Sequence, residues 1–252
     1  MPNHTSRHRA RVGATILLAA LAAGGCTHAA KGGGASSGAA KGAAAGGAKA
    51  VGAEANNGPP NGLETKTPAA VQRAAAATLK NAKSVHVTVT GPNQPLRLDL
   101  RIQGNASTGT IGTGATTFQV TSIGADTWIK GDPRALRALG IPAASAQRVA
   151  GHWFKAPWRQ ASGLAGFSLD SLAGSVGKND TPLKPKVATA TLDGRKVLVL
   201  SQRNGAKLFV AATGAAFPLR TDEKAGRVLF SEYGVDFHIT APVDVVDLAA
   251  AG

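Results

Sequence analysis

The stretch SVHVTVTGPNQPLRLDLRIQ, residues 84–103, decides the fold of this chain. In residues 84–90, valines alternate with histidine and threonine. In residues 96–103, leucine and isoleucine alternate with arginine, aspartate and glutamine. A period of two residues places all the apolar side chains of a strand on one face. The stretch therefore predicts two antiparallel strands, each with one apolar and one polar face.

Helical and strand patterns lie on both sides of this stretch. Apolar residues recur at helical spacing over 68–82, after a Thr-Pro start, which predicts a helix. A second, short helix is predicted to start at Asp132-Pro133 and to end before Gly140, and a third to span 168–176. Asp-Gly and Asn-Gly pairs between β-rich runs are strong hairpin signals. Further strands are predicted at 106–113, 116–123, 126–130, 186–192, 195–202, 206–212, 217–222, 226–232 and 235–240.

This order of elements indicates the α+β class. A helix is followed by antiparallel strands, by short helices and by a second set of antiparallel strands. One domain over residues 67–252 accommodates all of them. The sequence shows no internal repeat that would indicate a duplication.

The amino-terminal stretch MPNHTSRHRARVGATILLAALAAGGC has the layout of a cleaved export signal. Its apolar run of about a dozen residues is too short for a membrane helix, which needs roughly 20. Ala23-Gly24-Gly25-Cys26 is similar to a lipobox, although lipoboxes favour leucine where Ala23 stands. We expect residues 1–25 to be a signal peptide that is cut between Gly25 and Cys26, with a diacylglyceryl group on the Cys26 thiol.

Cys26 is the only cysteine of the chain, so the domain has no internal disulfide. A lipid-modified Cys26 would hold the protein to the cell membrane on its extracytoplasmic side. The sequence leaves open whether the new amino terminus carries a further acyl chain such as palmitate. It also leaves open cleavage at a nearby Ala-x-Ala-like site, with an incidental thiol at Cys26.

Residues 26–66, which begin with Cys26, consist mostly of alanine, glycine, serine, asparagine and lysine. Such a segment buries too little apolar surface to offset the entropy of ordering it. We expect a flexible tether whose roughly 40 residues hold the domain roughly 30 to 40 Å from its anchor. An alanine-rich helix over 39–55 is the alternative, and its interior glycines disfavour it.

The net charge of +14 is concentrated in the domain. Three positive charges belong to the signal arginines and two, net, to the tether, which leaves +9 for residues 68–252. A basic domain is attracted to anionic lipid headgroups. We expect no nucleic-acid partner, because the chain is exported and shows no arginine-rich tract or base-stacking motif.

Three features together resemble a known family: the amino-terminal helix before the strands, the segment VAGHWFKAPW at 149–158, and FPLRTDEKAGRVLFSEYGVDFHITAP at 217–242. With the lipobox, they make the chain similar to the LolA/LolB-type lipoprotein-carrier superfamily and, most closely, to actinobacterial LppX/LprG-type lipoproteins. The residues that carry the last feature are Pro218, Phe230, Tyr233, Gly234, Ala241 and Pro242.

The resemblance implies a strongly curved antiparallel sheet, a half-barrel, wrapped around short helices, with an apolar space that holds acyl chains. The ligand would be a lipid or a glycolipid. Ordinary core packing is the first interpretation for each residue expected to line the space, because alternating hydrophobic residues occur in any two-layer domain. These candidate groove residues are Leu98, Leu100, Phe118, Val120, Trp128, Leu136, Leu139, Trp153 and Val199.

Enzymatic chemistry finds no support in the sequence. A Gly-x-Ser-x-Gly elbow is absent and the sole cysteine is assigned to the anchor, so no acyl-transfer nucleophile is nominated. His86, His152 and His238 lack metal-ligand spacing. Asp222-Glu223 falls in a predicted hairpin turn, where solvated charges are expected. We expect neither a cofactor nor a metal.

The sequence thus predicts a membrane-anchored, non-enzymatic, monomeric protein that binds a lipid or a lipidated molecule, with transfer across the envelope as a further step. The main alternative is an envelope protein-interaction or sensor module that uses the same curved sheet without a lipid. A cell-wall scaffold, whose groove its own side chains fill, is a third.

Overall fold

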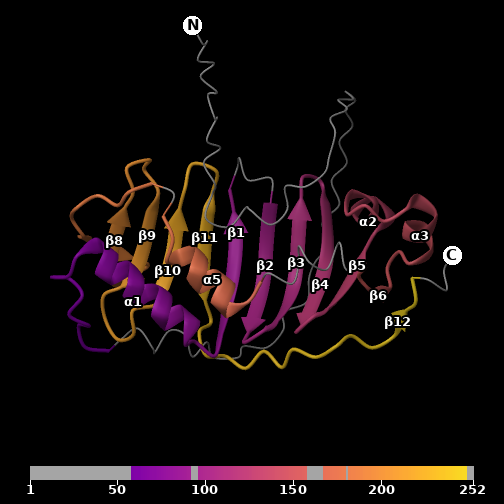
Figure 1. The fold of residues 1–252 in the computed structure, drawn as a ribbon, viewed down its shortest axis with the longest axis horizontal. Helices are drawn as coiled ribbons and strands as arrows, with labels where there is room; N and C mark the ends of the chain where they lie inside the picture. The colour runs from indigo at the N-terminus through magenta and orange to yellow at the C-terminus, as the bar shows by residue number, and fades with distance from the viewer. Residues whose placement is uncertain (1–57, 92–95, 158–166, 180, 249–252) are drawn as a thin grey trace, which may run out of the picture.

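The computed structural model describes residues 58–91, 96–157, 167–179 and 181–248 (Figure 1). The predicted signal peptide, Gly25, Cys26 and the tether up to residue 57 lie outside the described residues, so these assignments stay predictions. None of the helices among the described residues is long and apolar enough to cross a membrane.

Twelve strands form one curved, unclosed sheet (Figure 1). They are β1 Ser84–Thr90, β2 Leu96–Gln103, β3 Ala106–Thr113, β4 Thr116–Ile123, β5 Asp126–Gly131, β6 Trp153–Lys155, β7 Ala188–Leu192, β8 Arg195–Ser201, β9 Lys207–Ala211, β10 Pro218–Asp222, β11 Arg227–Ser231 and β12 Val245–Val246. Their order across the sheet is β12-β6-β5-β4-β3-β2-β1-β11-β10-β9-β8-β7. Every pair is antiparallel except β6 with β12.

Two pairs of helices lie on one face of this sheet, which we call the inner face (Figure 1). The helices α1 Pro68–Lys80 and α5 Leu169–Val176 pack together near β1, β10 and β11. The helices α2 Pro133–Ala138 and α3 Ala143–Arg148 pack together at the other end, over β4 and β5. The structure confirms the α+β class and the curved sheet that wraps around short helices.

Local sequence explains why α1 forms where it does. The Thr67 hydroxyl accepts a hydrogen bond from the backbone N–H of Ala70, and Pro68 occupies the first turn. Val71, Ala75 and Leu79, at spacings of four residues, are fully buried. The start of the helix therefore follows from capping, and its orientation from the apolar stripe.

The amino-terminal end of the described chain is bonded to the domain. Pro60 forms a β-bridge with Thr213, and the side-chain amide of Asn61 donates to the carbonyl oxygen of Ala211 at 2.8 Å. Leu63 packs against the core. The segment from residue 58 onward, which falls in the predicted tether, thus contacts the fold.

Residues 235–240 are not the strand that the sequence predicts. Gly234 and His238 have positive φ angles, of 77° and 48°, which interrupt an extended chain. The backbone N–H of Phe237 donates to the Gln103 side chain at 2.9 Å instead of to a strand. β1 already pairs with β2 and β11, so no ladder position beside it is left for this segment.

Candidate functional site

A continuous apolar surface covers the middle of the inner face, over β2, β3 and β4. Cross-strand register places Leu98 opposite Ile111 and Ile111 opposite Phe118. All members of this surface are at most 5% exposed. We call it the β2–β4 apolar face; its residues are Leu96, Leu98, Leu100, Ile111, Phe118 and Val120.

Gly109 leaves this face without a side chain at its centre, because it pairs with Leu100 on one side and with Val120 on the other. Its φ of 151° is one that other residues rarely adopt, and a Cβ atom there would lie 2.0 Å from the carbonyl oxygen of Asp99. The close approach of the β2 backbone therefore requires glycine.

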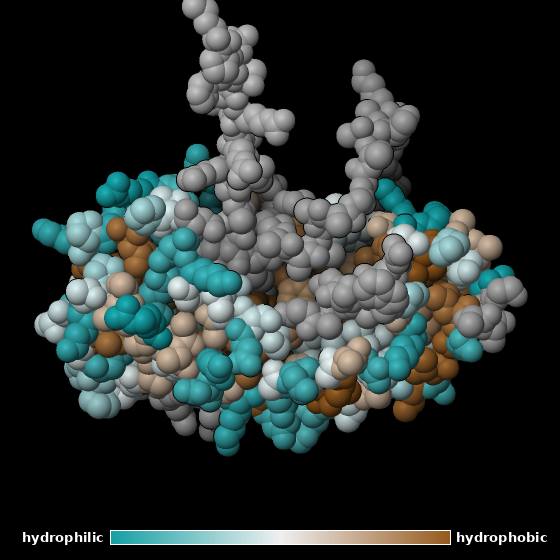
Figure 2. Space-filling model, viewed as in Figure 1, coloured by the Kyte–Doolittle hydropathy of each residue, from teal (hydrophilic) through white to brown (hydrophobic). Residues whose placement is uncertain are grey.

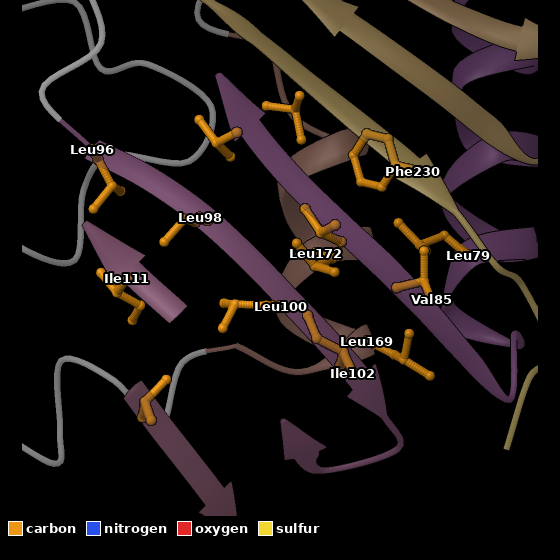
Figure 3. Packing of buried hydrophobic residues seen from close by; sticks show 14 of the residues in the cluster. Leu79, Val85, Leu96, Leu98, Leu100, Ile102, Ile111, Leu169, Leu172 and Phe230 are labelled. Carbon is orange, nitrogen blue, oxygen red and sulfur yellow. The ribbon is translucent and has the colours of Figure 1, made fainter. Parts of the chain in front are cut away.

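One helix from each pair borders the β2–β4 apolar face. Figure 3 shows Leu169 and Leu172 of α5 beside Leu100 and Ile102 of β2, whereas Leu96 and Ile111 lie away from α5. At the other border, α2 approaches β4 and β5 closely. A Cβ atom built on Gly131 would lie 3.1 Å from Phe118 and 3.4 Å from Leu136.

The structure brings together six of the nine candidate groove residues. Leu98, Leu100, Phe118, Val120 and Leu136 belong to one buried cluster, and the partly buried Leu139 packs against it. They lie in the buried core between the sheet and the helices. Whether they contact a ligand stays a prediction.

Trp128, Trp153 and Val199 do not line the same space, which corrects the sequence prediction. Trp128 and Trp153 are each adjacent to an inner-face residue, Ile129 and Phe154, and so point to the opposite, outer face.

Val199 belongs to a separate outer-face cluster, whose buried members are Val197, Val199, Phe209, Ala211 and Leu219. The strand β8 is buried on both faces, so its run of apolar residues did not reveal which face Val199 occupies.

A cavity of about 20 Å³ lies between the helices and β8–β10, lined in part by Gln72, Asn179 and Gln202. It has room for about one water molecule. Two larger hollows lie on the outer face: one of about 590 Å³ beside Lys130, His152 and Trp153, and one of about 210 Å³ over β1–β4.

His86 lies between two carboxylates. Its Nε2 lies 2.7 Å from Asp99 and its Nδ1 lies 3.7 Å from Glu232. Ser231 is the cross-strand neighbour of His86, but its hydroxyl donates to the backbone carbonyl oxygen of His86 at 3.5 Å. Both ring nitrogens of His86 thus face acidic groups, and the hydroxyl of Ser231 contacts the backbone of His86 instead of its ring.

No group of three or more histidine, cysteine, aspartate or glutamate side chains within the described ranges could hold a metal ion.

Comparison with known proteins finds likeness in structure only. No family model matches the chain, and no curated protein matches it. The fold is similar to the crystal structure of LprF from Mycobacterium bovis, with a TM-score of 0.48 and 16% identity, over 73% of this chain and 99% of LprF. It is also similar to the crystal structure of the Mycobacterium tuberculosis lipoprotein LppX, with a TM-score of 0.42 and 16% identity, over 69% of this chain and 98% of LppX.

The sequence patterns did not predict three elements of the fold, α3, β6 and β12. Trp153 of β6 lines the outer hollow, as does Asp244, just before β12. β6 and β12 are three and two residues long, and they pair in parallel between segments about 90 positions apart. Such short strands carry too few residues to show a period.

Proposed function

We propose that this chain is an exported lipoprotein, anchored through Cys26 on the extracytoplasmic side of the membrane, whose domain binds a lipid or a lipidated molecule. The binding surface would be the β2–β4 apolar face. The protein would act as a non-enzymatic carrier, and transfer of the bound molecule across the envelope would follow from the reach of its tether.

The observation that carries this proposal is the position of the β2–β4 apolar face between two separate pairs of helices (Figures 1 and 3). A ligand that enters there needs only one pair of helices to move, while the β-ladder beneath stays intact. Burial of an acyl chain contributes about 0.8 kcal/mol per methylene group. That gain offsets the cost of displacing short helices and of immobilising the ligand.

The anchor sequence supports the membrane location. A sole cysteine directly after an apolar run and three small residues suits a lipid-modified terminus better than a structural thiol. Two acyl chains on Cys26 would make the attachment stable, which one chain would not.

Native mass spectrometry with organic extraction tests lipid binding. We would use the chain from residue 27 onward, because it keeps Pro60, Asn61 and every other described residue. The expected result is a stoichiometric lipid that co-purifies with the protein. A mass without lipid, unchanged after incubation with envelope lipids, would contradict the proposal.

A matched pair of variants locates the ligand. Leu98→Phe adds volume to the β2–β4 apolar face, and Val199→Phe adds volume at a residue that is also buried, but on the outer face. We expect Leu98→Phe to reduce the lipid-bound fraction and Val199→Phe to leave it unchanged. Equal effects of the two substitutions would show that the inner face does not hold the lipid.

Exposed apolar residues near β12 favour one second candidate, a module that binds an envelope protein. Val243 is 78% exposed and Val245 is 41% exposed. Figure 2 shows hydrophobic residues gathered where Figure 1 places β6 and β12. A domain without bound lipid, together with a loss of partner capture from envelope extracts in Val243→Ser, would favour this function.

A further inference from the structure

Five exposed basic residues gather at one edge of the sheet, where β8 turns into β9 and β10 into β11. We call them the basic edge: Lys178, Lys184, Arg203, Lys207 and Lys224. Figure 1 shows both turns at the same upper edge, and Figure 2 shows hydrophilic residues along it.

Backbone contacts bring these residues together from four separate segments. The backbone N–H of Lys184 donates to the carbonyl oxygen of Ser201 at 2.7 Å, and the N–H of Arg203 donates to Pro182 at 3.1 Å. Lys207 pairs with Ser201 on β8 and with Asp222 on β10.

Lys178 and Lys224 complete the edge. Lys178 precedes Asn179, whose side chain accepts from Gln202 at 3.3 Å. Lys224 lies in the turn that Glu223 and Gly226 close with a backbone hydrogen bond of 2.9 Å.

Among the described residues, the basic side chains of this edge outnumber the acidic ones. Among the described residues of this edge, two carry carboxylates, Asp222 and Glu223, and Asp222 already forms ion pairs of 2.9 Å with Arg220 and Arg227; Asp180 lies outside the described residues. The two carboxylates therefore face seven cations in all. A surface of this kind attracts an extended anionic partner.

We infer that the basic edge docks the domain on an anionic membrane surface and so orients it relative to the bilayer. Each lysine or arginine near such a surface strengthens binding roughly fivefold. The described chain begins at the β9–β10 part of the sheet, through Pro60 and Thr213. A five-residue strand such as β9 spans roughly 17 Å. A tether with a reach of roughly 30 Å therefore lets the basic edge meet the membrane.

A second basic group makes a matched control. Arg134, Arg137 and Arg148 are exposed on α2 and α3, at the opposite end of the sheet from the tether junction. They match the basic edge in the kind of charge but not in position. If position decides docking, reversing their charge leaves the orientation unchanged.

Lysine footprinting of the full lipidated protein in vesicles tests this inference. One set of vesicles contains phosphatidylcholine alone, and the other contains equal parts of phosphatidylcholine and phosphatidylglycerol. We expect an amine-reactive reagent to label Lys178 and Lys224 severalfold less on the anionic vesicles, with Lys155 at the far end unchanged. High salt should abolish the protection, because the Debye length falls from about 10 Å at 0.1 M to about 3 Å at 1 M.

Charge-reversing substitutions distinguish the role of the basic edge from that of the arginines on α2 and α3. We expect Lys184→Glu with Arg203→Glu and Lys207→Glu to remove the protection of Lys178 and Lys224. The matched triple substitution Arg134→Glu, Arg137→Glu and Arg148→Glu should preserve it. Equal labelling on both kinds of vesicle, or equal effects of the two triple variants, would overturn the inference.

The inference rests on the membrane anchor of the proposed function but not on lipid binding by the inner face. The experiment distinguishes a wrong anchor assignment from a wrong docking surface. A wrong anchor assignment leaves the protein outside the vesicle fraction, whereas a wrong docking surface leaves it in that fraction with lysines labelled alike on both vesicles.

Discussion

Gln72 of α1 and Asn179, just beyond the end of α5, exchange two side-chain hydrogen bonds, of 2.8 and 2.7 Å. The Gln72 amide also donates to the carbonyl oxygen of Val176 at 2.7 Å, and Asn179 accepts from Gln202 of the β8–β9 turn. The contact satisfies a helix-end carbonyl group that α5 cannot pair internally. It therefore adds a polar contact to the apolar packing that holds this pair of helices on the sheet.

We expect Gln72→Ala to lower the free energy of unfolding by about 1–3 kcal/mol, because the substitution leaves the buried carbonyl oxygen of Val176 without its side-chain donor. Hydrogen exchange should then accelerate in α5 more than in β2 and β3. Gln147→Ala, at an exposed site on α3, serves as the control and should change neither quantity. A Gln72→Ala protein that unfolds at the same denaturant concentration as the parent would show that the contact contributes nothing.

Substitution of Gly109 should be far more damaging than substitution of other glycines with positive φ. Gly109→Ala places a methyl group 2.0 Å from a backbone oxygen, so β2 and β3 must separate. We expect a loss of about 3 kcal/mol or more in chemical denaturation.

Gly114 provides the comparison, because its φ is 56° and a Cβ atom there would meet nothing within 4 Å. Gly114→Ala should cost only about 1 kcal/mol. Similar losses for both variants would mean that the backbone conformation, and not the contact with β2, determines the requirement for glycine.

The elements that the sequence predicts well are those whose residues alternate strictly. β1 and β2 alternate apolar and polar side chains, and their burial follows the same alternation. The Asp193-Gly194 turn also forms as expected, with φ angles of 49° and 78° at its two residues. In these places, local sequence and tertiary burial agree.

The candidate site was harder to predict because some side chains reverse the expected alternation. In β5, Thr127 is buried on the inner face and Trp128 points outward, so the larger apolar residue does not mark the core. Thr127 is accommodated by a hydrogen bond between its hydroxyl and that of Ser122, at 3.0 Å. A sequence alone shows the residue types but not this cross-strand pair, and hence not the direction of Trp128.

The anchor assignment makes a direct prediction about Cys26. Cys26→Ser removes the only thiol of the chain, so it should abolish incorporation of a fatty-acid analogue into the protein and release it from the membrane fraction. Thr27→Ser, at the neighbouring position, should leave both unchanged. Metabolic labelling followed by membrane fractionation measures the two effects. Continued labelling of Cys26→Ser would place the lipid on another residue.

Tyr233 links the stability of the domain to pH. Its hydroxyl donates to the carbonyl oxygen of Pro218 at 2.5 Å, and its ring stacks on Phe217 with centroids 4.1 Å apart. Burial raises the pKa of the Tyr233 phenol well above its ordinary value of 10.0. The folded protein therefore keeps its proton at a pH at which the unfolded chain has lost it.

The stability that depends on this proton is fully present below pH 10 and declines above it, by about 1.4 kcal/mol per pH unit. Tyr233→Phe should lose about 1 kcal/mol at neutral pH, with the hydrogen bond, but should lack this added decline. The lysines titrate in both proteins. The difference between the two pH dependences of the free energy of unfolding therefore gives the contribution of the Tyr233 phenol alone.

Because Tyr233 is the only tyrosine of the chain, phenolate absorbance in the ultraviolet gives an independent reading. It should rise only as the protein unfolds. A rise near pH 10 in a protein that is still folded would mean that water reaches the Tyr233 hydroxyl, and that the stacked pair with Phe217 does not close this part of the core.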